Sequence, residues 1–351
     1  MNQTEIRKDD HIKIALDEDV SSKHNYWDYI KLIHNALPEL NKDEIKYETN
    51  IFEKKIDAPI IIAGMTGGYK KAEKINKNLA VAAENFQIGM GVGSQRAAIE
   101  KKELKKTYSV VKEHDIPLIF SNIGVSQIVE WGAKKTLDYA NEMIDMIDAD
   151  VFTICLNFLQ EIVQAEGDSD AKGALEVINY LSDNLDKPVV VKESGAGISF
   201  EVAKKLIEAN ISGIDVGGLS GTSFSAIEYY RSKKMKDRIH ERGGKTFWNW
   251  GIPTPTSIIE VIDATEHKIP IIATGGIRNG LDAGKAIVLG ADAAGIAHNL
   301  LKPAVKGIDE TMFEIEAIIK ELRATMFLTG SKNLNDLKDV DWTVTGDKLW
   351  M

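Results

Sequence analysis

Short apolar runs rich in isoleucine and valine recur along the 351-residue chain, each followed by Gly, Ser or Asn and then by a helical pattern. Continuous apolar runs of this length are typical of strands buried on both faces of a parallel sheet. The pattern predicts eight strands, which are Pro59–Ala63, Ile88–Val92, Pro117–Ser121, Val151–Leu156, Pro188–Lys192, Gly213–Val216, Pro270–Thr274 and Ala293–Ile296.

Helices are predicted between these runs, where apolar residues recur at i, i+3 and i+4. Leu137–Ile147 and Ser199–Ala209 show this spacing most clearly, and Gly280–Leu289 is the shortest example. Strands that alternate with helices eight times favour an α/β fold of the TIM (β/α)8 barrel type. A doubly wound open sheet is the alternative.

Three segments fall outside this alternation, which are residues 1–57, 218–268 and 303–351. We expect the chain to form three regions. Residues 1–57 would form an N-terminal extension, 58–302 the barrel, and 303–351 a C-terminal tail packing on the barrel, with an amphipathic helix over Asp309–Leu328. Residues 218–268 are longer than one loop requires and contain the aromatic stretch FWNWGIPTPT.

Composition narrows the class of protein. Hydrophobic residues make up 44% and charged residues 27%, which is typical of a soluble globular chain. The net charge of −10 argues against a nucleic-acid or membrane-surface partner. A single cysteine excludes a disulfide framework. We find no apolar signal segment and no run of about 18 apolar residues, so we expect a cytoplasmic protein.

The loops after the strands are the expected source of chemistry, because a parallel barrel binds its ligands at the carboxyl ends of its strands. Glycines there let a backbone approach a ligand closely, and N–H groups at helix starts bind anions. These loops are small, polar or glycine-bearing, and they include GMTGG (64–68), GVGSQR (91–96), SNIG (121–124), KESG (192–195), GGLSGTS (217–223) and GGIRNG (275–280).

The loops after the seventh and eighth predicted strands are the most informative pair. In this fold a phosphate is frequently held between the loops after strands 7 and 8. Gly275–Arg278 and Ala297–His298 occupy those positions. We interpret them as a phosphate cup for a cofactor such as FMN; the alternative is two glycine turns that close the barrel.

Lys192 ends the apolar run VVVK, so its ammonium would point from the barrel core into the mouth. A lysine there loses hydration unless it meets an anion. One interpretation is a counter-charge for the N1/O2 edge of a reduced, anionic flavin. The other is a structural pair with Glu193.

Two polar clusters are candidates for substrate binding. Gln160 and Glu161 follow Asn157 where strand 4 meets its helix, and a carboxylate there could hold Mg²⁺, which usually bridges to substrate phosphates. Alone, Glu161 is equally an early-turn residue favoured by the helix dipole. Arg7, Lys8 and His11 could close over a diphosphate, with Arg96 opposite, or belong to a solvated terminus.

Taken together, these motifs resemble the type 2, FMN-dependent isopentenyl-diphosphate isomerases. The resemblance covers nearly the whole chain in order, through RKDDH, AGMTGG, GVGSQR, SNIG, LNFLQE, VQAEGD, VVVKESGAGIS, SGTS, WGIPT, ATGGIRNG and FLTGSKNLNDL. It implies a barrel enzyme, forming homotetramers or homo-octamers, that interconverts isopentenyl and dimethylallyl diphosphate. It also implies reduced FMN and Mg²⁺ as cofactors, with NADPH as the reductant.

The resemblance assigns roles to individual residues. Gln160 would lie beside the allylic carbons, Glu161 would ligate Mg²⁺, and Glu228 would support a proton network beside the flavin. Gln160, Lys192 and Glu228 are thus the implied catalytic residues. The substrate would be bound by Arg7, Lys8, His11, Ser94, Gln95, Arg96, Asn157 and Gln160. FMN would be contacted by Gly64, Met65, Thr66, Ser94, Asn122, Lys192, Ser220, Thr222, Gly275, Gly276, Ile277, Ala297 and His298.

The sequence departs from the family pattern at three positions. Cys155 stands where the family usually has a histidine that helps bind diphosphate, Ala165 replaces a proline, and Asn249 replaces an aspartate. A thiol cannot supply the cation that a protonated imidazole can, and losing one such hydrogen bond typically costs about 1.5–3 kcal/mol. A flavin-binding paralogue with weakened isomerase activity is therefore an alternative.

Two other enzyme classes are considered. An FMN barrel oxidoreductase of the 2-hydroxy-acid oxidase kind would need a histidine base at the mouth, and His298 is badly placed for that role. A nucleotide-dehydrogenase-like enzyme would use Cys155 as a nucleophile, which requires an accessible and electropositive site. Cys155 lies in the apolar run FTICL, which favours an inert thiol.

Overall fold

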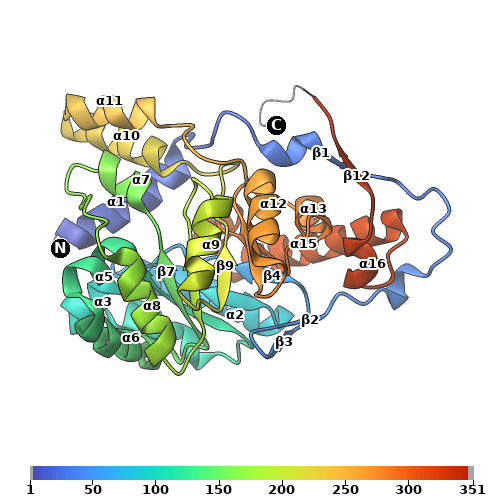
Figure 1. The fold of residues 1–351 in the computed structure, drawn as a ribbon, viewed down its shortest axis with the longest axis horizontal. Helices are drawn as coiled ribbons and strands as arrows, with labels where there is room; N and C mark the ends of the chain where they lie inside the picture. Colours follow the sequence, from blue (N-terminus) through green and yellow to red (C-terminus); the bar gives the residue numbers. More distant parts are fainter. Residues whose placement is uncertain (1–2, 347–351) are drawn as a thin grey trace.

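A closed barrel of eight parallel strands forms the centre of the molecule in the computed structural model, which describes residues 3–346 (Figure 1). Strand β11 pairs with β4 and closes the ring, with Ala294 opposite Ile60. The eight predicted strands and the barrel are confirmed, and the open doubly wound sheet is excluded. The strands are β4 (Ile60–Ile62), β5 (Gly89–Gly91), β6 (Ile119–Gly124), β7 (Val151–Cys155), β8 (Val189–Lys192), β9 (Gly213–Asp215), β10 (Ile271–Thr274) and β11 (Ala293–Ile296).

The barrel interior is filled by side chains, which leaves a ligand only the mouth. Ile61, Phe120, Val190 and Ile272 belong to one buried cluster. The hairpin of β2 (Thr49–Ile51) and β3 (Lys54–Ile56) joins this cluster and places Phe52 against Gly213, where an added Cβ would lie 2.7 Å from the ring. Part of the N-terminal extension thus packs against the barrel interior.

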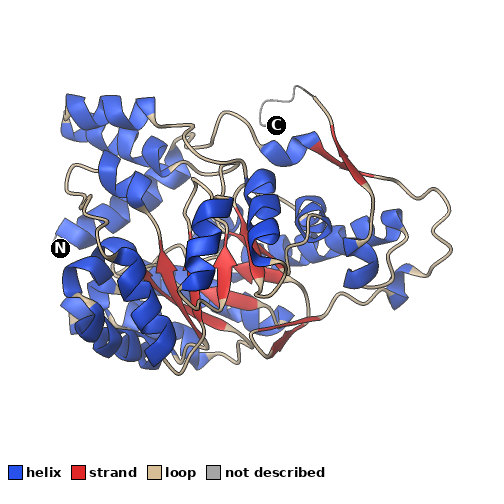
Figure 2. Cartoon of the chain, viewed as in Figure 1, coloured by secondary structure: helices blue, strands red, loops and turns tan. Residues whose placement is uncertain are grey.

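Helices surround the strands (Figure 2). The predicted helices are confirmed as α6 (Ala133–Ile147), α9 (Phe200–Glu208), α13 (Gly280–Val288) and α15 (Ile308–Thr329). Helix α6 begins four residues before the predicted start at Leu137. The prediction missed its first turn, AKKT, because that turn carries no apolar periodicity. The other barrel helices include α2 (Ala72–Phe86), α8 (Ala174–Asn184), α12 (Thr254–Thr265) and α14 (His298–Lys306).

A group of helices stands above the mouth, at the upper left of Figure 1. It contains α1 (Gln3–Asp17), α7 (Phe158–Val163), α10 (Phe224–Met235) and α11 (Arg238–Thr246). The long segment 218–268 supplies α10, α11 and α12. Its aromatic stretch reaches the extension, since Trp248 Nε1 donates to Ser21 O at 2.8 Å.

The C-terminal segment of the described chain meets the N-terminal extension. Strand β12 (Trp342–Val344) pairs antiparallel with β1 (Ile30–Leu32), after α16 (Leu334–Lys338) (Figure 1). The tail therefore contacts the extension as well as the barrel. No helix within residues 3–346 combines the length and the apolar character needed to cross a membrane.

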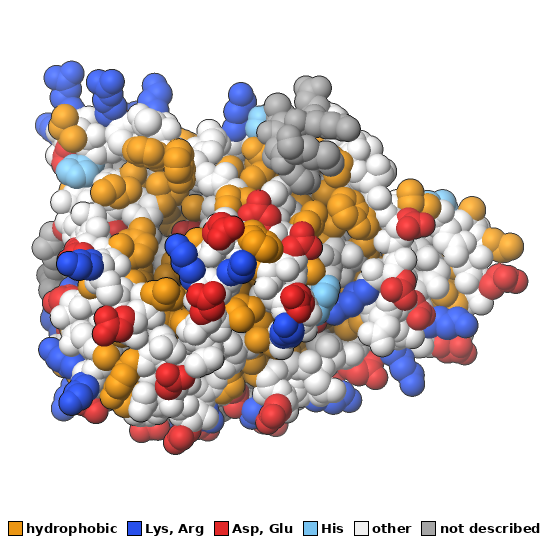
Figure 3. Space-filling model, in the orientation of Figure 1, with side chains coloured by type: hydrophobic (Ala, Val, Ile, Leu, Met, Phe, Trp, Pro, Cys, Tyr) orange, Lys and Arg blue, Asp and Glu red, His pale blue; other side chains and the backbone are white. Residues whose placement is uncertain are grey.

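On the face drawn in Figure 3, acidic and basic side chains are interspersed, with a row of lysine and arginine along the top left over α10 and α11. This face therefore carries no broad basic surface.

Candidate active site

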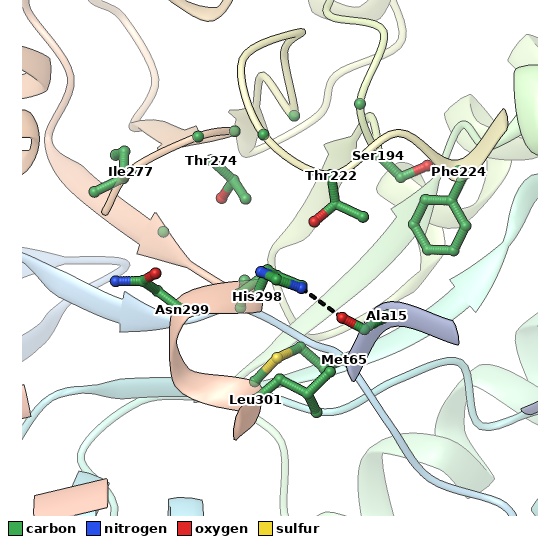
Figure 4. A pocket seen from close by; sticks show the side chains of 18 of the residues that line it. Ala15, Met65, Ser194, Thr222, Phe224, Thr274, Ile277, His298, Asn299 and Leu301 are labelled. Atoms are coloured by element: carbon green, nitrogen blue, oxygen red, sulfur yellow. Dashed lines mark hydrogen bonds between the residues drawn. The ribbon is translucent and has the colours of Figure 1, made fainter. Parts of the chain in front are cut away.

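A cavity of about 530 Å³ opens at the mouth of the barrel. Its volume lies within the range of about 300–1,000 Å³ that is usual for small-molecule sites. It is walled by the loops after β4, β8, β9, β10 and β11 and by one side of α1. Figure 4 shows Met65, Thr222, Phe224 and Ile277 around it. The loops predicted to carry chemistry thus converge on one space.

The glycine loop after β10 has a backbone that other residues would strain. Gly275 has φ +123° and Gly276 has φ +74°. A Cβ on Gly276 would lie 2.5 Å from Ser220 Cβ, and one on Gly275 would lie 2.4 Å from Gly218 O. Nearby, α14 begins after Ala297 without a side-chain cap, which leaves its first N–H groups to bind an anion. The two loops have the form of a phosphate cup.

Lys192 lies at the carboxyl end of β8, opposite Cys155 on β7 and Asp215 on β9, and it lines the cavity. No hydrogen bond or ion pair joins its Nζ to another residue in the described part of the chain. The alternative pair with Glu193 is not formed, because that carboxylate accepts the N–H groups of Ser194 and Ala196, each at 2.5 Å. An unpaired cation in a largely buried site fits an anionic ligand.

Glu193 and Cys155 are both affected by burial. Desolvation raises the pKa of Glu193 to about 7. Burial also raises the pKa of the Cys155 thiol, which keeps it neutral near pH 7. A neutral thiol is a poor nucleophile, so the geometry favours an inert Cys155.

Helix α1 lies across the mouth. Lys8 Nζ donates to Ser94 O at 2.7 Å and to Tyr108 OH at 3.0 Å. At the other end of α1, His298 Nε2 donates to Ala15 O at 2.7 Å, as Figure 4 shows. Burial, and next the charge of Arg7, lower the pKa of Lys8 to about 7. The basic cluster of the N-terminus therefore belongs to a helix at the cavity and is not a solvated terminus.

The chain after α1 also bonds to the cavity loops. Ser22 N donates to Gly221 O at 2.7 Å, and Asn25 Nδ2 donates to Gly276 O at 2.7 Å. Lys23 N donates to Asn249 Oδ1 at 2.7 Å, and an amide oxygen accepts this bond as a carboxylate would. The extension is thus tied to the loops after β9 and β10.

Comparison with known proteins decides the family. Isopentenyl-diphosphate delta-isomerase of Thermoplasma acidophilum is 48% identical over 334 residues, covering 95% of this chain and 94% of the relative. The isomerase of Archaeoglobus fulgidus is 43% identical, covering 99% of this chain and 98% of the relative. The isomerase of Methanosarcina mazei is 42% identical, covering 99% of this chain and 93% of the relative. The chain belongs to the isopentenyl-diphosphate delta-isomerase family.

The barrel of this family member is shared with other flavoproteins. Residues 156–343 match the family model "FMN-dependent dehydrogenase", which supports FMN as a cofactor. A structure of mandelate oxidase with (S)-2-phenylpropionate has a TM-score of 0.65 at 16% identity, covering 98% of both chains. That likeness shows the fold alone, and the closer relatives favour the isomerase family over a hydroxy-acid oxidase.

The residues implied by the isomerase family divide into two sets. The first set lines the cavity and consists of Lys8, His11, Gly64, Met65, Thr66, Lys192, Ser220, Thr222, Gly275, Gly276, Ile277, Ala297 and His298. The second set does not line it and consists of Arg7, Ser94, Gln95, Arg96, Asn122, Asn157, Gln160, Glu161 and Glu228.

Gln95 has a fully buried side chain and does not line the cavity. Its Nε2 donates to Met143 O at 2.8 Å, and its Oε1 accepts from Asn122 N at 3.1 Å. The side-chain amide therefore holds α6 to the barrel, and a substrate contact by Gln95 stays a prediction. Arg96 is engaged with Glu100, with Nε and Oε1 2.6 Å apart.

Gln160 and Glu161 stand on α7. Glu161 is buried, and its two oxygens accept from Asn157 Nδ2 at 2.8 Å and Asp168 N at 3.1 Å. No group of three His, Cys, Asp or Glu side chains within residues 3–346 is arranged to hold a metal. Since Mg²⁺ is usually held by one or two carboxylates and substrate phosphates, a lone Glu161 is compatible with such a site.

Asn122 lies below the mouth, against a small space inside the barrel. Its Nδ2 donates to Val92 O at 3.1 Å, while its buried Oδ1 has no partner among the described residues. Buried polar atoms rarely lack a partner. This free acceptor, the glycine cup and the unpaired Lys192 together fit a flavin nucleotide.

The sequence analysis missed several cavity residues. Ser22, Asn25, Ser194 and Thr274 line the cavity, and Tyr108 holds Lys8 at its edge. Ser194 is in the quoted loop KESG and could have been included. Thr274 likewise ends a predicted strand, in the motif ATGGIRNG. Ser22, Asn25 and Tyr108 carry no local signal, because their roles depend on how the N-terminal extension crosses the mouth.

Proposed function

We propose that this protein interconverts isopentenyl diphosphate and dimethylallyl diphosphate with FMN as its cofactor. The observation that carries the proposal is the single cavity in which a glycine cup, an unpaired lysine and the basic side of α1 face one another. Membership of the isomerase family supports the choice of reaction. The anionic groups of a flavin nucleotide and of an isoprenoid diphosphate would meet those cationic and N–H-rich walls.

FMN would be held at the side of the cavity formed by β10, β11 and β8. Gly275, Gly276 and the start of α14 would bind its phosphate, and Lys192 would lie at the edge of its ring system. When bound and reduced, this cofactor supplies an acid–base group and an electron-rich surface next to the substrate. Lys192 contributes the positive charge that stabilises an anionic ring.

The diphosphate would be bound from the N-terminal side. Lys8 and His11 line the cavity from α1, and residues 1–57 would act as a lid that contributes to this site. Glu161 would hold Mg²⁺ jointly with the diphosphate oxygens. Residues 58–302 would carry the FMN and substrate sites, with 303–351 as the packing tail.

The reaction is a 1,3-proton shift in which a proton adds to the terminal alkene carbon and another leaves C2. Gln160 would hydrogen-bond near the allylic carbons without titrating, and Glu228 would support a proton network beside the flavin. A tertiary cation is trapped easily by water, so α1 would protect it by covering the mouth. We further propose NADPH as reductant, a homotetramer or homo-octamer, and a cytoplasmic location.

An anaerobic assay tests the proposal. Purified protein with FMN, dithionite and Mg²⁺ is expected to convert isopentenyl diphosphate to dimethylallyl diphosphate, and oxidised FMN should support far less conversion. Equal rates with oxidised and reduced FMN would contradict it, as would a chain that does not bind FMN. Stoichiometric flavin reduction by a 2-hydroxy acid would favour an oxidoreductase instead.

A further inference from the structure

Four ionisable side chains form a chain of contacts that leads from the cavity into the protein. His11 on α1 lies with Nε2 2.6 Å from Glu228 Oε1 on α10. Glu228 Oε2 accepts from Arg231 Nη1 at 3.1 Å, and Arg231 makes a two-pronged contact with Glu166, with Nη1 2.9 Å from Oε2. Glu228 is 0% exposed and Arg231 is 4% exposed. Only His11 reaches the cavity wall.

The chemistry of Glu228 fixes the tautomer of His11. Burial alone would raise the pKa of Glu228, but His11 and Arg231 outweigh it and lower that pKa. An ionised carboxylate only accepts hydrogen bonds, so His11 Nε2 must carry the proton. No described residue bonds to Nδ1 of His11. Nδ1 is therefore the nitrogen left for a ligand in the cavity.

The charges of the other three groups explain why the arrangement suits an anion. Glu166 and Glu228 contribute two negative charges and Arg231 one positive charge, which leaves one negative charge behind the imidazole. A second proton on His11 would bring the sum to zero. An anion at Nδ1 would thus meet a ring whose positive form is compensated within the protein.

The same contacts join three segments. Glu166 follows α7, which carries Gln160 and Glu161, and Arg231 lies one turn after Glu228 on α10. A bidentate guanidinium–carboxylate contact fixes direction as well as distance. The contact therefore sets α10, and through Glu228 the ring of His11, relative to α7.

We propose that Arg231 and Glu166 are positioning residues for His11, holding Glu228 so that Nδ1 of His11 is presented to an anionic group in the cavity. The identity of that anion as the substrate diphosphate rests on the proposed function. The positioning itself depends only on the contacts of these four side chains.

A double-mutant cycle tests the proposal in the FMN-loaded enzyme. Glu166→Gln keeps the shape of the side chain and removes its charge, and we expect it to raise KM for isopentenyl diphosphate about tenfold with kcat changed less than about twofold. His11→Gln should raise KM by a similar factor. In the His11→Gln background, Glu166→Gln should have no further effect. Effects that multiply in the double variant would overturn the proposal, since they would show that Glu166 does not act through His11.

A spectroscopic measurement gives a second test that needs no turnover. In protein labelled with ¹⁵N-histidine, we expect the neutral His11 ring to carry its proton on Nε2 and Nδ1 to shift when inorganic pyrophosphate is added. In Glu166→Gln the shift should need about tenfold more pyrophosphate. A wild-type ring protonated on Nδ1 alone would overturn the proposal.

A matched control and a conservative variant separate positioning from folding. Glu84→Gln removes a carboxylate that contacts His114 at 2.8 Å outside the cavity, and it should leave KM unchanged. Arg231→Lys retains the positive charge but cannot make the bidentate contact with Glu166. We expect its KM to lie between that of the wild type and that of Glu166→Gln. A wild-type chain that binds pyrophosphate at His11 but isomerises nothing would refute the proposed function and leave the positioning role intact.

Discussion

Nε1 of Trp27 donates a hydrogen bond to the carbonyl oxygen of Gly275 at 2.9 Å, although the two residues are 248 positions apart in the chain. Trp27 is 0% exposed. Lys285 Nζ in turn donates to Trp27 O at 2.7 Å. The glycine turn assigned to phosphate binding is therefore held in part by the N-terminal extension, which couples that segment to the cofactor site.

Trp27→Phe tests this coupling, because it keeps an aromatic ring and removes the donor to Gly275. We expect a loss of about 0.5–1.5 kcal/mol in unfolding free energy, the usual net contribution of one hydrogen bond, because the Gly275 carbonyl is only partly buried. FMN affinity should fall several-fold. Urea unfolding and flavin-fluorescence titration measure the two effects. Trp342→Phe, on the exposed strand β12, is the control, and an unchanged FMN affinity in Trp27→Phe would count against the coupling.

Gly276→Ala tests the phosphate cup directly. Its φ of +74° and a Cβ only 2.5 Å from Ser220 O make alanine incompatible with the turn. We expect FMN affinity to fall at least about tenfold, since the loop must move. Gly243→Ala on helix α11 is the matched control, because its Cβ would have nothing within 4 Å. Retention of FMN with wild-type affinity by Gly276→Ala would show that the cup lies elsewhere.

The lowered pKa of Lys8 predicts that the protein takes up a proton when it binds a diphosphate. Burial lowers its pKa to about 7, so the side chain is mostly neutral at pH 8 in the free protein. A bound diphosphate favours the ammonium and raises that pKa, so binding at pH 8 should take up about 0.8 of a proton if the pKa rises to about 9. Calorimetry in buffers of different ionisation enthalpy measures this number.

Two variants on the same helix make the Lys8 experiment specific. Lys8→Met should abolish the uptake. Lys13→Met removes an amine that is 51% exposed and pairs with Asp9, and it should leave the uptake unchanged. Binding without proton exchange in the wild-type protein would show that Lys8 does not meet the diphosphate.

The barrel could be predicted from the sequence because strands that are buried on both faces are apolar at nearly every consecutive position. Runs such as VVVK and IIAT are apolar at consecutive positions, and the glycines after them mark where the chain turns. The cup formed by Gly275 and Gly276 was predicted for the same reason, since a phosphate site occupies a fixed place in this topology.

The local pattern leaves open whether the basic N-terminal cluster closes over the mouth or is solvated, because the crossing by α1 depends on contacts between distant segments. Lys8 and Ser94 are 86 positions apart, and His11 and Glu228 are 217 positions apart. No local pattern specifies such pairs, and a basic cluster near a terminus is usually solvated. Gln95 shows that a local motif also leaves the direction of a side chain undetermined. A polar residue in a glycine loop is expected to face a ligand, but its amide is fully bonded inside the protein.

Cys155 supplies the last prediction, because it occupies the end of β7 directly opposite Lys192 on β8. The resemblance to the isomerases implies a histidine there. Burial raises the pKa of the thiol, so Cys155 remains neutral and offers no charge-assisted hydrogen bond to a phosphate. Cys155→His should therefore strengthen diphosphate binding by about 1.5–3 kcal/mol, which lowers KM roughly ten- to a hundredfold. Steady-state kinetics with isopentenyl diphosphate measure the change, and Cys155→Ser, which is small and uncharged, is the control. An unchanged KM in Cys155→His, with FMN still bound, would mean that this strand end does not reach the diphosphate and that Lys8 and His11 bind it without help from β7.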